Sequence, residues 1–353
     1  MDTFEKAQET SRRIADDIPK NPMEYRVLTG DRPTGTLHLG HYFGSLANRV
    51  NLQRQGVDLF ILIADQQVLT DHEDSSRISH LTRELVIDQV SVGIDFDSGK
   101  NFIFPHSQIP ELNQLLVPFL TLVSVSELER NPTTKEEIRS ANIESVSAGM
   151  LVYPVHQACD ILSVNANLVP VGKDQLPHIE LTRTIAKRFN DRFCPNDKIF
   201  REPQALLSEV PSLVGLDGKQ KMSKSRGNAI MLNSTRDEIS LVLSKARTDS
   251  EKFITFDPAS RPEIANLLTL ASLVMGKKPE QIADSVGNGG AKALKELLVQ
   301  EIDRFLAPIR EKRRELERDR DYVTKILRNG VARVRNEASE TLSRVLMAMN
   351  MHL

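Results

Sequence analysis

Apolar runs of strand length alternate with helix-length segments through the first 190 residues of the chain. The apolar runs predict strands over residues 25–30, 58–65, 101–105 and 168–172. Apolar positions at helical spacing predict helices over residues 38–55, 75–92, 111–128, 154–164 and 174–190. This alternation is typical of a parallel sheet whose strands are joined by helices. We therefore expect an α/β fold.

The texture of the sequence changes at a Gly/Lys/Ser-rich stretch, LVGLDGKQKMSKSRGN, and nearly everything beyond it has helical periodicity. Apolar positions at helical spacing, among them Val334, Ala338, Leu342 and Val345, mark one long C-terminal helix. We expect five regions: a helical leader over 1–22, an α/β domain over 23–207, a mobile loop over 208–232, a helical domain over 233–325, and a C-terminal helix over 326–353 that packs back on the α/β domain.

Charge and cysteine content exclude several classes of protein. The 46 lysines and arginines nearly balance the 48 aspartates and glutamates, so the chain is not globally basic. Residues 304–335 nevertheless carry eleven basic and five acidic side chains, either as a solvated helix face or as a contact for phosphates. Cys159 and Cys194 form no C-x-x-C pair, and no apolar stretch reaches the length of a membrane span. We expect a cytoplasmic protein without disulfides or a membrane anchor.

The first predicted strand leads into His38-Leu39-Gly40-His41 at the start of a helix. Two imidazoles three residues apart share one helical face, and the free N–H groups at a helix start favour a phosphate. Gly40 removes a side chain where a flat purine ring can lie. The segment has neither the glycine spacing of a dinucleotide fingerprint nor a Walker lysine, and no third ligand is spaced to complete a metal site. We expect a nucleotide-phosphate site without a protein-bound metal.

Far downstream, the Gly/Ser-rich loop contains Lys221-Met222-Ser223-Lys224-Ser225. Two ammonium groups on such a loop can close on phosphates whose other side the histidines hold. HLGH and KMSKS together on an α/β domain resemble the motifs of class I aminoacyl-tRNA synthetases. Within that class, GDRPTGTLHLGHYFGSLANRV, SVSAGMLVYPVHQACDIL and LVPVGKDQLPHIELTR are similar to segments of the tryptophanyl-tRNA synthetases. The resemblance runs from about residue 25 to the C-terminus.

The resemblance implies a Rossmann-like catalytic domain followed by an all-helical domain that binds the tRNA anticodon. It implies ATP-dependent activation of L-tryptophan, transfer of the tryptophanyl group to tRNA(Trp), and a homodimer. Attack of a carboxylate on the α-phosphorus of ATP needs positioning and charge neutralisation rather than a general base. Mg²⁺ is expected to accompany the ATP phosphates.

Matching positions imply a role for each site residue. The catalytic residues are His38, His41, Lys221 and Lys224. The ATP-binding residues are Arg32, Thr34, Gly40, Gly172, Asp174, Met222 and Ser223. The tryptophan-binding residues are Leu28, Gly30, Gln67, Tyr153, Gln157, Asp160, Val169, Val171 and Gln175. Among them, Asp160 is implied to accept the indole N–H, while Tyr153 and Gln175 hold the substrate ammonium group.

Three alternatives remain open. A tyrosyl-tRNA synthetase would share Asp160, but Leu28 stands where those enzymes place a tyrosine. A synthetase-like paralogue without tRNA charging is disfavoured by the KMSKS segment and the basic C-terminal helices, and a small nucleotidyltransferase by the length of the helical region. Arg32, Gln67 and Gln157 depart from the commonest bacterial pattern, and the combination is similar to the auxiliary second form of tryptophanyl-tRNA synthetase found in some bacteria.

Overall fold

A parallel β-sheet lies at the centre of the protein. The computed structural model describes residues 3–70, 74–140, 145–207, 213–218, 220, 222–223 and 226–351. In these ranges five strands form one sheet in the order β3-β2-β1-β4-β5, and every neighbouring pair is parallel. The strands are β1 (Arg26–Asp31), β2 (Asp58–Ile63), β3 (Asn101–Pro105), β4 (Leu168–Val171) and β5 (Gln204–Leu207). The first four confirm the predicted strands, whereas β5 was not predicted.

Helices cover both faces of the sheet, which is why its strands are apolar runs rather than alternating ones. In β2, Leu59 and Ile61 face one core cluster, while Phe60 and Leu62 face a second cluster on the opposite side. The helices of this part are α1 (Thr3–Asp17), α2 (Leu39–His41), α3 (Ala47–Gln55), α4 (Ile78–Ser91), α5 (Pro110–Leu120), α6 (Val125–Arg130), α7 (Pro132–Ser140), α8 (Ala148–Ser163) and α9 (Leu176–Phe193). The α/β prediction is thereby confirmed.

Two predicted helices are interrupted. Residues 38–55 form the short α2, a π-helical turn over Tyr42–Leu46, and α3. Residues 111–128 divide into α5 and α6, because the Ser124 hydroxyl accepts the main-chain N–H of Glu127 and starts a new helix there. The hydrophobic periodicity therefore located both segments but not the local signals that divide them.

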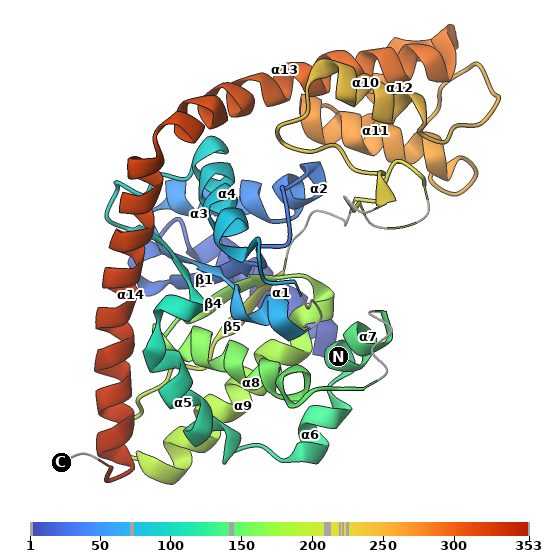
Figure 1. The fold of residues 1–353 in the computed structure, drawn as a ribbon. Coiled ribbons are helices and arrows are strands. Elements are labelled where there is room, and N and C mark those ends of the chain that lie inside the picture. The colour runs from blue at the N-terminus through green and yellow to red at the C-terminus, as the bar shows by residue number, and fades with distance from the viewer. Residues whose placement is uncertain are drawn as a thin grey trace.

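Most of the chain beyond residue 235 is helical, as predicted. Its helices are α10 (Arg236–Ser244), α11 (Pro262–Met275), α12 (Pro279–Val286), α13 (Gly290–Arg318) and α14 (Arg320–Ala348). Figure 1 shows α10, α11 and α12 grouped away from the sheet, with α13 leading from them to α14. No helix in the described ranges combines the length and apolar character needed to cross a membrane.

The helices at the two ends of the chain pack against the sheet. The Ser11 hydroxyl of α1 donates to the Ala205 carbonyl at 3.1 Å and accepts the Leu207 N–H at 3.0 Å, so α1 bonds to β5. At the other edge α14 packs against β3, and Figure 1 shows α14 running along one side of the α/β part. A Cβ on Gly330 would come within 1.9 Å of the Ile103 carbonyl oxygen, so this approach requires glycine. Since α14 begins at residue 320, the boundary predicted at 326 falls inside a helix.

Arg313 of α13 is buried against α4, with an exposed fraction of 3%. Its guanidinium pairs with Glu84 and Asp88 of α4 and with Glu317 one turn ahead at 3.1 Å. The charge count over residues 304–335 included Arg313 among the side chains open to a partner. That expectation is wrong for Arg313, which is an internal connection between α13 and the α/β part.

Candidate active site

Both sequence motifs line one cavity of about 860 Å³ at the carboxyl end of β1. In open parallel sheets, ligands bind at the carboxyl ends of the strands. Six residues predicted for ATP binding or catalysis line it: Arg32, Thr34, His38, His41, Met222 and Ser223. Arg77, which was not predicted, adds a further positive charge. The cavity therefore brings together residues from distant parts of the chain around a site suited to polyphosphate.

The rings of the two motif histidines lie close together at α2, tilted by 35° to each other. Their ring centroids are 3.8 Å apart, and the His38 main-chain N–H donates to His41 Nδ1 at 3.2 Å. Burial, together with the neighbouring His41, lowers the pKa of His38 to about 3, and burial lowers the pKa of His41. Both rings are therefore neutral at pH 7. Since Nδ1 of His41 accepts a hydrogen bond, its proton resides on Nε2, where it can be donated to a phosphate oxygen.

The segment that follows the KMSKS motif is joined to the HLGH motif by main-chain hydrogen bonds. Leu39 donates to Ile230 and Leu232 donates to Leu37, both at 2.9 Å. A Cβ on Gly40 would lie 2.9 Å from the His38 ring, so the absence of a side chain makes room for that imidazole, and Met222 of the second motif lies just beyond, with its Cβ 3.4 Å from the same point. Lys221 and Lys224 lie outside the described residues, and their catalytic roles stay predictions.

A buried ion pair stabilises one wall of the first cavity. The Asp31 carboxylate accepts from Arg49 at 2.5 Å and from Gln89 at 3.0 Å. Although burial opposes ionisation, the Arg49 charge and these hydrogen bonds hold the pKa of Asp31 below its usual value. Asp31 is thus an ionised carboxylate whose oxygens are already engaged by the protein.

A second, smaller cavity of about 170 Å³ is bordered by α5 and α8. Four residues predicted for tryptophan binding line it: Gln67, Tyr153, Gln157 and Asp160. His106 and His156 line it as well and were not predicted. Two signals could have identified them. His106 directly follows a predicted strand at the edge where ligands bind, and His156 precedes Asp160 by four residues on the same helical face.

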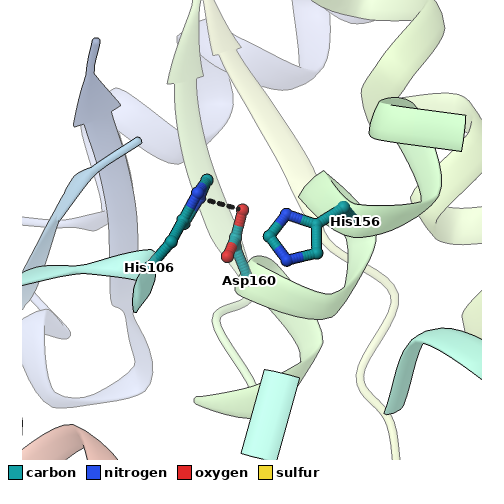
Figure 2. Close-up of side chains that lie close together, drawn as sticks. All are labelled: His106, His156 and Asp160. Carbon is teal, nitrogen blue, oxygen red and sulfur yellow. Dashed lines mark hydrogen bonds and ion pairs between the residues drawn. The ribbon is translucent and has the colours of Figure 1, made fainter. Parts of the chain in front are cut away.

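His106, His156 and Asp160 form a buried cluster in this cavity, shown in Figure 2. His106 Nε2 lies 3.0 Å from Asp160 Oδ2, whereas Asp160 Oδ1 is buried without a hydrogen-bond partner. Burial disfavours the charged form of His106, but Asp160 outweighs it and raises the pKa of that imidazole. Burial lowers the pKa of His156. The cavity thus presents one unpaired carboxylate oxygen to a ligand.

The same three side chains form the one group in the described ranges whose donor atoms could converge on a cation, since these atoms lie within 4.8 Å of one another. The sequence predicts no metal site. A cation here would occupy the space that the carboxylate presents to an organic ligand, and His106 and Asp160 already hydrogen-bond to each other.

The ring and the hydroxyl of Tyr153 face different surroundings. The ring lines the second cavity, but the hydroxyl donates to Glu137 at 2.5 Å and lies 2.9 Å from His178 Nε2. Burial and the Glu137 hydrogen bond raise the pKa of Tyr153. Protein groups therefore satisfy the phenol, and the ring face is what Tyr153 offers to a ligand.

Comparison with known proteins gives the family. The protein-family model described as tRNA synthetases class I (W and Y) matches residues 20–307 of the chain. The chain belongs to this family. It is 42% identical to the tryptophan–tRNA ligase of Streptococcus mutans over 340 residues, covering 92% of this chain and 98% of that one. It is 40% identical to the tryptophan–tRNA ligase of Treponema pallidum over 334 residues, covering 92% and 97%.

A solved synthetase has the same architecture. The tryptophanyl-tRNA synthetase of Campylobacter jejuni, crystallised with ADP and tryptophan, superimposes with a TM-score of 0.80 at 29% identity, covering 92% of this chain and 99% of that one. The predicted family and the Rossmann-like fold class are thereby confirmed. The predicted likeness to the auxiliary bacterial form stays a prediction.

Several residues predicted for the site do not line the cavity that was expected for them. Gly30 borders the first cavity rather than the second. The others are outside the described linings of both: Leu28, Gly40, Val169, Val171, Gly172, Asp174 and Gln175. Leu28 and Val169 are buried in the apolar core that also contains residues of α8. Gly172 and Asp174 lie on an exposed turn after β4. Their contacts with substrate stay predictions.

Proposed function

We propose that this synthetase activates L-tryptophan with ATP and transfers the tryptophanyl group to tRNA(Trp). The observation that carries the proposal is Asp160 Oδ1, a buried acceptor without a partner in a small cavity. Leaving such an atom unpaired is costly, and an indole N–H would satisfy it. A phenol O–H would also satisfy it, so the choice of tryptophan over tyrosine rests on the curated relatives, which are tryptophan–tRNA ligases.

The chemistry requires electrostatic stabilisation more than proton transfer. A carboxylate oxygen of tryptophan attacks the α-phosphorus of ATP, the bond to the bridging oxygen breaks, and pyrophosphate leaves with its electron pair. His38 and His41, both neutral, would donate hydrogen bonds to the phosphates. Lys221 and Lys224 would neutralise the departing pyrophosphate.

Mg²⁺ would be carried by the ATP phosphates. Asp31 is the one carboxylate among the described residues that line the first cavity, and Arg49 and Gln89 engage it. This supports a metal ion held mainly by the nucleotide and water, as Mg²⁺ commonly is.

Replacing Asp160 with asparagine tests the substrate assignment. We expect kcat/KM for tryptophan in ATP–pyrophosphate exchange to fall by about 10- to 100-fold, the usual range for a hydrogen bond to a charged group. The KM for ATP should change far less, because ATP occupies the other cavity. Tyrosine serves as the control substrate, and the wild-type protein should give no exchange with it. Exchange with tyrosine, or an unchanged kcat/KM for tryptophan in the variant, would contradict the assignment.

The helical region over residues 233–325 would bind the tRNA anticodon, with part of the contact made by α13 and α14. Most of the basic side chains in residues 304–335 form ion pairs within the protein. Examples are Arg310 with Asp303 at 2.5 Å and Arg335 with Glu111 at 3.1 Å. Four exposed arginines have no ion-pair partner within the part of the chain that the structure describes: Arg314, Arg318, Arg320 and Arg328. These four are the candidates for phosphate contacts.

Charge reversal at Arg314, Arg318 and Arg328 tests the tRNA contact. We expect aminoacylation to fall by roughly 10-fold or more, with a shallower dependence on salt, because each lost phosphate contact removes counterion release. ATP–pyrophosphate exchange should be unchanged. The matched control reverses three exposed charges on the α/β part, Lys187, Arg192 and Arg201. If both triple variants charge tRNA equally well, the tRNA is bound elsewhere.

The protein would act as a homodimer in the cytoplasm. A contact between copies near α5 and α6 would cover two exposed apolar side chains, Val117 at 66% and Val125 at 61%. Both cysteines are free thiols, which is usual in a reducing compartment. Residues 23–207 would form the catalytic domain, and residues 208–232 the loop that closes on ATP.

A further inference from the structure

The two carboxylate oxygens of Asp160 have different environments. Oδ2 lies 3.0 Å from His106 Nε2, and Oδ1 has no partner although it is buried (Figure 2). The two side chains come from different elements, because Asp160 is on α8 and His106 follows β3. Asp160 is 1% exposed and His106 2%, so no bulk water competes for this contact.

The hydrogen-bond pattern assigns the donor. Nδ1 of His106 is buried without a partner, and Nε2 faces the carboxylate. Nε2 therefore carries the proton and donates it to Oδ2, in the neutral and in the charged form of the ring. A carboxylate held at one oxygen cannot turn freely about its terminal torsion. The second oxygen, Oδ1, is then held in one orientation beside the cavity that Asp160 lines.

His106 is itself held in place by its neighbours. Ser107 donates its main-chain N–H to Asp65 Oδ1 at 3.1 Å and its hydroxyl to Asp65 Oδ2 at 2.5 Å. This fixes the chain directly after His106 at the carboxyl end of β2. The His156 ring lies edge-on to the His106 ring, with centroids 4.7 Å apart. No hydrogen bond joins His156 to Asp160 among the described contacts, so only His106 anchors the carboxylate.

We propose that His106 is a positioning residue for amino-acid selection: by anchoring Asp160 Oδ2, it aims Oδ1 at the indole N–H of tryptophan. The inference rests on the proposed function, since it takes tryptophan as the substrate. It adds a specificity-determining residue outside both sequence motifs. Selection of a substrate with a ring N–H then depends on His106, which contacts the Asp160 carboxylate and does not contact the substrate N–H.

The test compares tryptophan with its benzothiophene analogue, in which sulfur replaces the ring N–H. The variants are His106→Leu, which cannot donate, and His106→Gln, whose amide can. We expect the wild-type protein to prefer tryptophan by about 10- to 100-fold in kcat/KM. His106→Leu should lower that preference to within about 3-fold, mainly through a higher KM for tryptophan, because the contact is made in ground state and transition state alike. His106→Gln should restore most of it.

The preference is a ratio measured on one preparation, so a partly folded variant does not distort it. If His106→Leu lacks turnover, equilibrium binding supplies the same ratio. The chain contains no tryptophan, so no tryptophan of the protein contributes to the fluorescence of bound L-tryptophan, and the analogue is measured by competition. His156→Gln is the matched control, since it alters the same cavity without removing the anchor. It should shift both substrates together and leave the ratio unchanged.

The outcomes separate the two proposals. A wild-type ratio in His106→Leu, or an equal loss of ratio in His156→Gln, would overturn the positioning role of His106. Absence of any tryptophan-dependent exchange by the wild-type protein would instead overturn the proposed function.

Discussion

Replacing Arg313 with leucine should lower the free energy of unfolding by about 3 kcal/mol or more. The guanidinium is buried between α13 and α4 and pairs with Glu84 and Asp88. Its removal leaves Asp88 without a cation in a site with almost no access to water, beside the partly buried Glu84, and an uncompensated buried charge is far more destabilising than an exposed one. Asp88 is itself nearly fully buried, and burial raises its pKa to about 6 even with Arg313 present. Thermal or urea unfolding measures the loss.

Arg314→Leu is the matched control for this experiment. Arg314 is the next residue on α13, and it is exposed and forms no ion pair with a described residue. We expect its replacement to change the unfolding free energy by no more than about 0.5 kcal/mol. Equal stability losses in the two variants would mean that the Arg313 ion pairs contribute nothing specific.

Replacing His41 with asparagine should slow adenylate formation by about 10²- to 10³-fold, the usual effect of removing one hydrogen-bond donor to transition-state charge. The asparagine amide oxygen can still accept the His38 N–H, as Nδ1 of His41 does. What the variant loses is the donor at the position of Nε2. His41→Gln places an amide donor near that position and should retain more activity. Single-turnover formation of the adenylate measures both rates.

The pH dependence separates a neutral donor from a cation. Burial lowers the pKa of both motif histidines below the ordinary value, that of His38 to about 3, so both rings are neutral at pH 7. The single-turnover rate should therefore show no step from either ring near the ordinary histidine pKa. A rate that rises as the pH falls through about 6.5, the ordinary value for histidine, would indicate an imidazolium instead.

Much of the fold and part of the site could be predicted because their signals are local. A strand buried on both faces is a continuous apolar run, and the two motifs are contiguous in sequence. β5 was missed because QALL is only four residues long and is bordered by polar residues and proline. His106 was missed for a different reason. Its partner Asp160 is 54 positions away, and only the sheet topology brings the two together.

Arg313 illustrates the limit of counting charges. Along the sequence it is one of several arginines in a basic segment, and nothing nearby distinguishes it from Arg314. The difference arises from Glu84 and Asp88, more than 200 residues earlier, which α4 presents to α13. A sequence pattern gives the charge of a segment, whereas tertiary contacts decide which of its charges reach solvent.

The helices near the two ends of the chain cover the edge strands of the sheet and thereby oppose aggregation. An open parallel sheet ends in two strands with unpaired main-chain groups, and such edges can recruit further strands from other molecules. Here α1 bonds to β5 at one edge through Ser11, and α14 lies against β3 at the other, close enough to require Gly330. A shortened protein that lacks either helix would therefore expose a pairing edge as well as apolar surface, and would precipitate during expression even though both cavities were retained.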